Sequence, residues 1–150
     1  MSVRVGQEIQ AVSRQAELKR LNVVAGILRD DDGKVLITER LEQGPFQGMW
    51  EFPGGKIGDG EHAEVALIRE LSEEIGVEAR SLKHFMHLRH DYPDRRVAIQ
   101  FFLVEQWVNQ PAGLEGQRIR WVAPEALAEE NLLPADKPVI QALVQPDGVT

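Results

Sequence analysis

Three glutamates, Glu70, Glu73 and Glu74, stand three or four residues apart in the stretch RELSEEIGV (69–77). Side chains at this spacing share one face of a helix, where like charges repel by roughly 0.2–0.5 kcal/mol per pair. Apart from Arg69, the stretch has no basic side chain to pair with them. A divalent cation such as Mg²⁺ prefers oxygen ligands and would turn this repulsion into binding. The spacing therefore favours a metal site over a solvated charged face.

The elements around these acids predict how they are positioned. A turn with the sequence Pro53-Gly54-Gly55 leads toward a helix expected at residues 63–76. Glycine permits close backbone approach, so carbonyl oxygens of this turn can complete a metal shell. Gly76 suits a left-handed helix C-cap. Apolar residues at three- and four-residue steps predict the stripe that faces the core: Val65, Ile68, Leu71 and Ile75.

The rest of the chain predicts more strands and a last helix. Residues 21–29 and 34–40 flank a DDDG turn and are expected to pair as a hairpin. Further elements are expected as strands at 49–52, 81–90, 96–108 and 117–122, a helical turn at 123–130 and a helix at 135–144. This order implies an α/β fold with one mixed sheet covered on two faces.

Composition limits the class of protein. The chain has 150 residues, which suits one domain, and it has no cysteine, which excludes disulfides and thiolate chemistry. A net charge of −7 argues against a general nucleic-acid-binding surface. No apolar run is long enough to span a bilayer, and residues 1–10 do not resemble a secretory signal. These features predict a cytoplasmic protein.

The segment from Gly55 to Val77 resembles the Nudix box, G-x5-E-x7-R-E-U-x-E-E-x-G-U with U an aliphatic residue, and it meets every fixed position. The resemblance implies an α/β fold of the Nudix type, an α/β/α sandwich with a central mixed β-sheet. It also implies hydrolysis of a nucleoside diphosphate linked to another group, with Mg²⁺ or Mn²⁺. Residues 21–150 would form this domain, and residues 1–20 an N-terminal arm with no assigned role.

The resemblance also assigns roles to single residues. Glu70, Glu73 and Glu74 resemble metal ligands, together with the Gly54 carbonyl, and Glu70 or an equivalent acid would help to deprotonate the attacking water. Arg69 resembles the arginine that orients a box glutamate through a salt bridge. Glu61 resembles an outer glutamate of the box.

The likeness extends to the MutT branch of the family through WEFPGGKI, YPDRR, FFLVEQW, LEGQ and LPADKPVI, over roughly residues 21–144. This branch hydrolyses 8-oxo-dGTP and so avoids replication errors. Glu115 resembles its extra metal-binding acid. The substrate-binding residues that the likeness implies are Arg40, Glu51, Phe52, Pro53, Gly54, Arg95 and Asp136. Tyr92 is expected to wall the base pocket with Phe52, and Arg96 to form a surface salt bridge. Trp50, Trp107 and Trp121 are expected to pack.

Asp136 departs from the MutT pattern, in which an asparagine reads the oxidised guanine. An amide both donates and accepts, whereas an ionised carboxylate only accepts. Asp136 could be protonated in an apolar pocket and donate. It could accept from other guanine donors with the base shifted, or the preferred base could be cytosine, which offers an amine. It could also simply stand near the N-terminus of the last helix, favoured by the helix dipole.

Three functions follow, and 8-oxo-dGTP hydrolysis is placed first. The alternative is a pyrophosphohydrolase for CTP or dCTP, including 5-methyl-dCTP. A non-catalytic Nudix nucleotide-binding domain would have eroded box acids, and none is eroded. The expected partner is a small-molecule nucleoside triphosphate, with no nucleic acid and no membrane, and the protein is expected to be a monomer or weak dimer.

Overall fold

The computed structural model describes residues 20–145, and its centre is a mixed four-stranded sheet with the order β4-β1-β6-β5. The strands are β1 (Arg20–Leu28), β4 (Gly54–Lys56), β5 (Glu78–Tyr92) and β6 (Arg95–Val108). β1 runs parallel to β6 and antiparallel to β4, and β5 is antiparallel to β6. The α/β class with a central mixed sheet is confirmed. The predicted arm lies outside the described residues except for Arg20, which begins β1.

A second, antiparallel sheet has the order β3-β2-β7, formed by β3 (Trp50–Glu51), β2 (Val35–Glu39) and β7 (Ile119–Val122). The predicted hairpin between the first two strands is therefore wrong. The turn itself forms, and the Asp30 carboxylate accepts the Lys34 N–H at 2.8 Å. However, both edges of β1 are occupied by β4 and β6, so β2 meets it only at a single bridge and continues into the other sheet.

Helix α2 (Ala63–Ile75) ends at Gly76, which has a φ of 74° as predicted for a left-handed C-cap. The predicted apolar stripe is half wrong, because Val65 and Ile68 are 53% and 39% exposed. The buried apolar residues of α2 are Ala66, Leu67, Leu71 and Ile75. The helix is rotated because it packs over Gly26, where a Cβ would stand 3.4 Å from both the Leu67 and Leu71 side chains.

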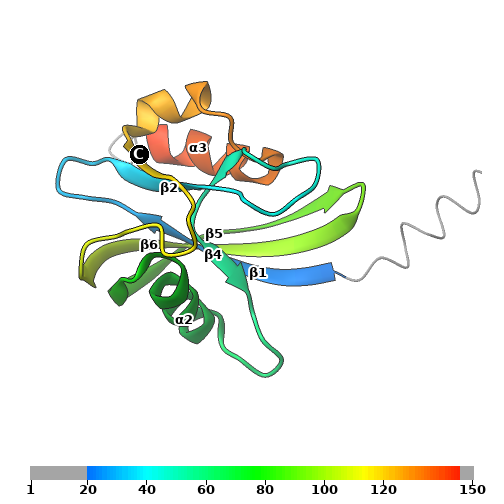
Figure 1. Cartoon of the computed structure of the whole chain (residues 1–150), viewed down its shortest axis with the longest axis horizontal. Coiled ribbons are helices and arrows are strands. Elements are labelled where there is room, and N and C mark those ends of the chain that lie inside the picture. The colour runs from blue at the N-terminus through cyan, green and yellow to red at the C-terminus, as the bar shows by residue number, and fades with distance from the viewer. Residues whose placement is uncertain (1–19, 146–150) are drawn as a thin grey trace, which may run out of the picture.

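Two cores lie on opposite faces of the mixed sheet. α2 covers one face, and the second sheet with α3 (Lys137–Val144) covers the other, as Figure 1 shows. Two 3₁₀ helices, η1 (Pro124–Glu129) and η2 (Pro134–Asp136), lead into α3, which has Pro138 in its first turn as predicted. Within residues 20–145, no helix is long and apolar enough to cross a membrane.

Candidate active site

A cavity of about 340 Å³ opens between the two sheets and α2. Nine of the predicted site residues line it: Arg40, Glu51, Phe52, Gly54, Glu70, Glu74, Arg95, Glu115 and Asp136. They come from six separate parts of the chain, so the fold brings together what the sequence spreads over almost 100 residues. Four predicted residues do not line it: Pro53, Glu61, Arg69 and Glu73.

Glu74 is the most deeply placed acid of α2. One carboxylate oxygen accepts the Gly54 N–H at 3.1 Å, and the other lies 3.4 Å from the Thr38 hydroxyl. Burial raises the pKa of Glu74 to about 8, and nearby Glu51, Glu115 and Glu70 add to the rise. Thr38, which is fully buried, was missed by the sequence reasoning, because nothing in the alternation of β2 distinguishes a polar support from a core residue.

Glu70 lies against the glycine turn. A Cβ at Gly55 would overlap its carboxylate, so only glycine leaves room for the acid at this point. Burial raises the pKa of Glu70, while Arg69, whose guanidinium donates to it at 2.8 Å, opposes the rise. The predicted glycine turn therefore packs directly against the Glu70 carboxylate. Its glycines form strand β4 and do not merely end the preceding strand.

This packing predicts the effect of Gly55→Ala. The added methyl group would displace the Glu70 carboxylate, and we expect turnover to fall by at least about tenfold, as for other changes to the partners of a catalytic group. Steady-state hydrolysis with Mg²⁺ measures this loss. Gly33→Asn is the control, because Gly33 has a φ of 82° in an open turn and asparagine tolerates that conformation. Unchanged turnover in Gly55→Ala would remove Gly55 from the site.

Arg69 and Glu61 form the support of the site, outside the cavity. Arg69 donates to both oxygens of Glu61 at 2.9 Å, to Glu70 at 2.8 Å and to the Lys56 carbonyl at 3.2 Å. The Arg69 hydrogen bonds lower the pKa of Glu61 to about 2, so Glu61 is ionised and serves as a fixed anchor. Glu73 is 59% exposed and contacts Arg69 only at 3.5 Å.

Glu115 reaches the cavity from the loop before β7, where its N–H donates to the Gln117 side chain at 2.9 Å. The Gln117 amide in turn donates to the Glu74 carbonyl at 3.0 Å, so a buried glutamine ties this loop to α2. Gln117 ends the same LEGQ stretch that predicted Glu115, but it was not predicted as a site residue. A lone glutamine in a loop carries no signal of burial.

The acids of the cavity fit a hard divalent cation. In the part of the chain that the structure describes, no three acidic or imidazole side chains already converge as a ligand cluster. However, the ionised forms of Glu70 and Glu74 are both destabilised. Burial raises the pKa of each, and nearby carboxylate charges, including that of Glu115, add to the rise. Oxygen donors crowded against a glycine backbone are the donor set that Mg²⁺ takes.

The other end of the cavity is apolar and holds Asp136. This residue is 5% exposed and makes no capping hydrogen bond to α3, although it stands at the helix start. Its Oδ2 atom is buried without a partner among the described residues. Burial raises the pKa of Asp136 well above its ordinary value, and the Glu51 charge raises it further. The alternative in which Asp136 is protonated and donates is therefore favoured over a simple helix-terminal role.

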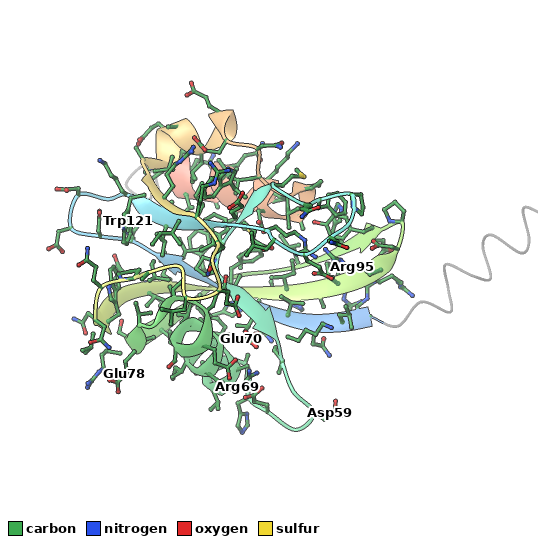
Figure 2. All side chains as sticks on the ribbon, viewed as in Figure 1. Asp59, Arg69, Glu70, Glu78, Arg95 and Trp121 are labelled. Carbon is green, nitrogen blue, oxygen red and sulfur yellow. The ribbon has the colours of Figure 1, made fainter. Side chains whose placement is uncertain are left out.

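Arginines flank this apolar end. Arg40 donates to Glu51 at 3.3 Å and to Glu42 at 2.7 Å. Arg95 lies over the Tyr92 ring with its guanidinium carbon 5.2 Å from the centroid, and its Nε is buried without a partner among the described residues. Arg69 and Glu70 come from α2, whereas Arg95 lies toward the hairpin end of β5 and β6 (Figure 2). Arg96 contacts Asp91 at 3.5 Å, the surface pair that was expected.

Phe52, Pro53 and Tyr92 were predicted at the substrate site, and the three tryptophans were predicted to pack. Pro53 is buried and its carbonyl accepts the Gly26 N–H at 2.8 Å, which joins the turn to β1. Phe52 is buried and lines the cavity, and Tyr92 does the same from β5. Trp50 packs in the core under Arg120. Trp107 and Trp121 stack with centroids 5.9 Å apart.

The chain belongs to the family defined by the NUDIX domain, whose model matches residues 24–142. The match covers most of the central mixed sheet, the glycine turn, α2 with its box acids and the second sheet.

The chain is similar to several MutT-type enzymes. The chain is 38% identical to an 8-oxo-dGTP diphosphatase of Escherichia coli K12, over 84% of this chain and 98% of that protein. It is 33% identical to a CTP pyrophosphohydrolase of the same organism, over 85% of this chain and 93% of that protein. A solved structure from work on MutT of Aliivibrio salmonicida and Vibrio cholerae matches with a TM-score of 0.74 at 38% identity, over 84% of this chain and 98% of that one.

Proposed function

We propose that the chain is a Mg²⁺-dependent nucleoside triphosphate pyrophosphohydrolase of MutT type, which converts 8-oxo-dGTP into 8-oxo-dGMP and pyrophosphate. Such an activity removes an oxidised nucleotide before it causes replication errors. One observation carries the proposal: a single cavity joins the box acids at one end to a buried, apolar base site with Asp136 at the other. The similarity to the 8-oxo-dGTP diphosphatase supports the same substrate.

The residues divide by what they would bind. Glu70, Glu74 and Glu115 would hold Mg²⁺, with the Gly54 carbonyl beside them. Glu73 would join this set after leaving its 3.5 Å contact with Arg69. When bound, the ion supplies positive charge that neutralises phosphates and stabilises the charge that develops on them. Arg69 and Glu61 hold Glu70 in place, and Glu70 is the candidate to accept a proton from the attacking water.

The nucleoside would lie at the other end of the cavity. Phe52 and Tyr92 wall this end and Glu51 lines it, while Pro53 lies outside the cavity and joins the glycine turn to β1. Arg40 and Arg95 can donate in fork geometry to phosphate oxygens or to a base edge. A protonated Asp136 would offer one donor and one acceptor, which is the pair that an amide offers.

A second candidate substrate is CTP or dCTP. The carboxyl group of Asp136 favours this substrate, because an ionised carboxylate at that position would accept a hydrogen bond from the cytosine amine. The 33% identity to a CTP pyrophosphohydrolase points in the same direction. We place the activity in the cytoplasm, on a free nucleotide rather than on nucleic acid or a membrane, and in a monomer or weak dimer.

The test is kcat/KM with Mg²⁺ for 8-oxo-dGTP, dGTP, CTP, dCTP and 5-methyl-dCTP, scored by pyrophosphate release. A strong preference for 8-oxo-dGTP over dGTP would support the first substrate, and a preference for cytidine nucleotides the second. Binding of these nucleotides without any hydrolysis would instead favour the non-catalytic alternative.

Metal removal gives a separate prediction. We expect EDTA to abolish hydrolysis and added Mg²⁺ or Mn²⁺ to restore it, because the ion would supply the positive charge that neutralises the substrate phosphates, and Glu70 and Glu74 would hold it. Isothermal calorimetry with Mg²⁺ alone should also show binding, and Glu115→Gln should weaken it. Full activity in EDTA would contradict the proposed role of the acids.

A further inference from the structure

Tyr92 makes a buried hydrogen bond that the proposed chemistry does not use. It is the one tyrosine of the chain, it is 4% exposed, and its hydroxyl oxygen accepts the Ala135 N–H at 3.1 Å. The two residues are 43 positions apart in sequence, so the bond joins the end of β5 to η2. Ala135 immediately precedes Asp136. The bond therefore acts on the backbone that carries the candidate base-reading carboxyl.

Asp136 has one other attachment for its carboxyl, a hydrogen bond from the backbone of Phe52. Its side chain makes no cap bond, and Oδ2 has no partner among residues 20–145. Its own N–H donates to the Leu133 carbonyl at 2.9 Å, a bond within the same short turn. The η2 turn has only three residues, and the Leu133 N–H just before it donates to the Trp50 carbonyl at 3.0 Å. The Ala135 bond holds the other end of the turn, next to Asp136, so its loss would give the carboxyl more freedom to move.

The Tyr92 ring, in contrast, is held on several sides. His90 packs against it at 4.4 Å between centroids and Phe46 meets it edge-on at 5.0 Å. The Arg95 guanidinium covers it at 5.2 Å. Because three neighbours hold the ring, its hydroxyl has a fixed position and can hold the short η2 turn in place through the Ala135 N–H.

We propose that Tyr92 is a positioning residue for base selection, which holds Asp136 at the base end of the cavity through the Ala135 N–H. The proposal rests on the proposed function, because it concerns how that site chooses its base. It adds a role for the hydroxyl group, distinct from the role of the ring as a wall of the pocket.

A double-mutant cycle tests the proposal, with Tyr92→Phe, Asp136→Ala and the double variant. Tyr92→Phe keeps the ring and removes the acceptor for the Ala135 N–H. The readout is the ratio of kcat/KM between the preferred nucleotide and dGTP, or between the preferred nucleotide and 8-oxo-dGTP if cytidine nucleotides are preferred. We expect Tyr92→Phe to lower this ratio at least threefold in the native background and to leave it unchanged when Asp136 is absent.

His90→Phe is the matched control, because it alters a neighbour of the Tyr92 ring and leaves the hydroxyl bond in place. Its ratio should stay at the native value. A merely structural role of Tyr92 would lower the melting temperature without moving the ratio. An equal change of ratio in both Asp136 backgrounds would overturn the proposal, since the hydroxyl would then act independently of Asp136.

Binding of the monophosphates separates this proposal from the proposed function. Dissociation constants for 8-oxo-dGMP, dGMP and dCMP can be measured without turnover. Tyr92→Phe should reduce the ratio of these constants between the preferred monophosphate and the others, as it reduces the ratio of kcat/KM. No preference among bases in the native protein would overturn both proposals. A clear preference that Tyr92→Phe leaves intact would overturn the role of Tyr92 alone.

Discussion

Glu74→Gln should lower kcat/KM by at least about 100-fold, because loss of even a partner of a metal ligand typically costs 10–100-fold. Glutamine has nearly the same shape and keeps an oxygen that can accept the Gly54 N–H, so the fold should be retained. It lacks the negative charge that would bind the cation. Hydrolysis of the best substrate over a range of Mg²⁺ concentrations measures the loss.

The same variant should be more stable than the native protein at high pH when metal is absent. Burial raises the pKa of Glu74 to about 8 in the folded state, whereas its ordinary pKa is 4.5. Between these two pH values the folded protein keeps a proton on Glu74 that the unfolded chain has released. The stability that this proton provides is present below pH 4.5 and is lost as pH rises through about 8. A glutamine side chain at this position does not titrate, so the variant has no such loss. Thermal melting in EDTA at pH 6 and pH 9 measures the difference.

Glu64→Gln is the matched control on the same helix, since Glu64 is in the first turn of α2 and does not line the cavity. It should change neither turnover nor the pH dependence of melting. Native turnover in Glu74→Gln at saturating Mg²⁺ would remove Glu74 from the ligand set. A loss of both activity and stability would mean that its role is structural.

The sequence predicted the parts of the structure that depend on local spacing. Glu70 and Glu74 share a face because both lie on one helix, and Gly76 ends that helix because a left-handed conformation is needed there. The box therefore predicted the acidic end of the cavity. The rotation of α2 was not predictable in the same way, because it depends on Gly26, a residue of a different element.

Long-range pairing was the part that the sequence left open. Neighbouring strands that flank a tight turn usually pair, but β1 has both edges filled by β4 and β6. That competition is visible only once all strands are placed. The support from Gln117 to Glu74 and from Tyr92 to Ala135 is of the same kind, since each bond spans 43 residues and leaves no local pattern.

Asp136→Asn should remove the part of the pH dependence of kcat/KM for 8-oxo-dGTP that comes from ionisation of Asp136. Because burial raises the pKa of Asp136, the native carboxyl is protonated at low pH and can donate to the guanine O6 while it accepts from N7–H. As pH rises and the carboxyl ionises, it loses the donor. An asparagine keeps both groups at every pH. The ratio of kcat/KM for 8-oxo-dGTP between Asp136→Asn and the native protein, measured from about pH 5.5 to 9, tests this expectation.

The size of the effect follows from the cost of a wrong pairing. A buried polar group that faces the wrong partner costs on the order of 1–3 kcal/mol, which corresponds to roughly 5- to 150-fold in the ratio. Asp136→Asn should therefore match the native kcat/KM for 8-oxo-dGTP while the native carboxyl is protonated and exceed it by that factor once the native carboxyl has ionised. Asp94→Asn, at an exposed turn position, is the control and should follow the native curve.

Protonation of Asp136 also connects the two candidate substrates. The neutral carboxyl suits 8-oxoguanine, and the ionised carboxylate suits the cytosine amine. Hydrolysis of dCTP relative to 8-oxo-dGTP should then rise with pH in the native protein and stay flat in Asp136→Asn. If both curves are flat and equal, Asp136 does not read the base. A native curve that rises through the range would show that one carboxyl, held in an apolar pocket, decides which base the site accepts.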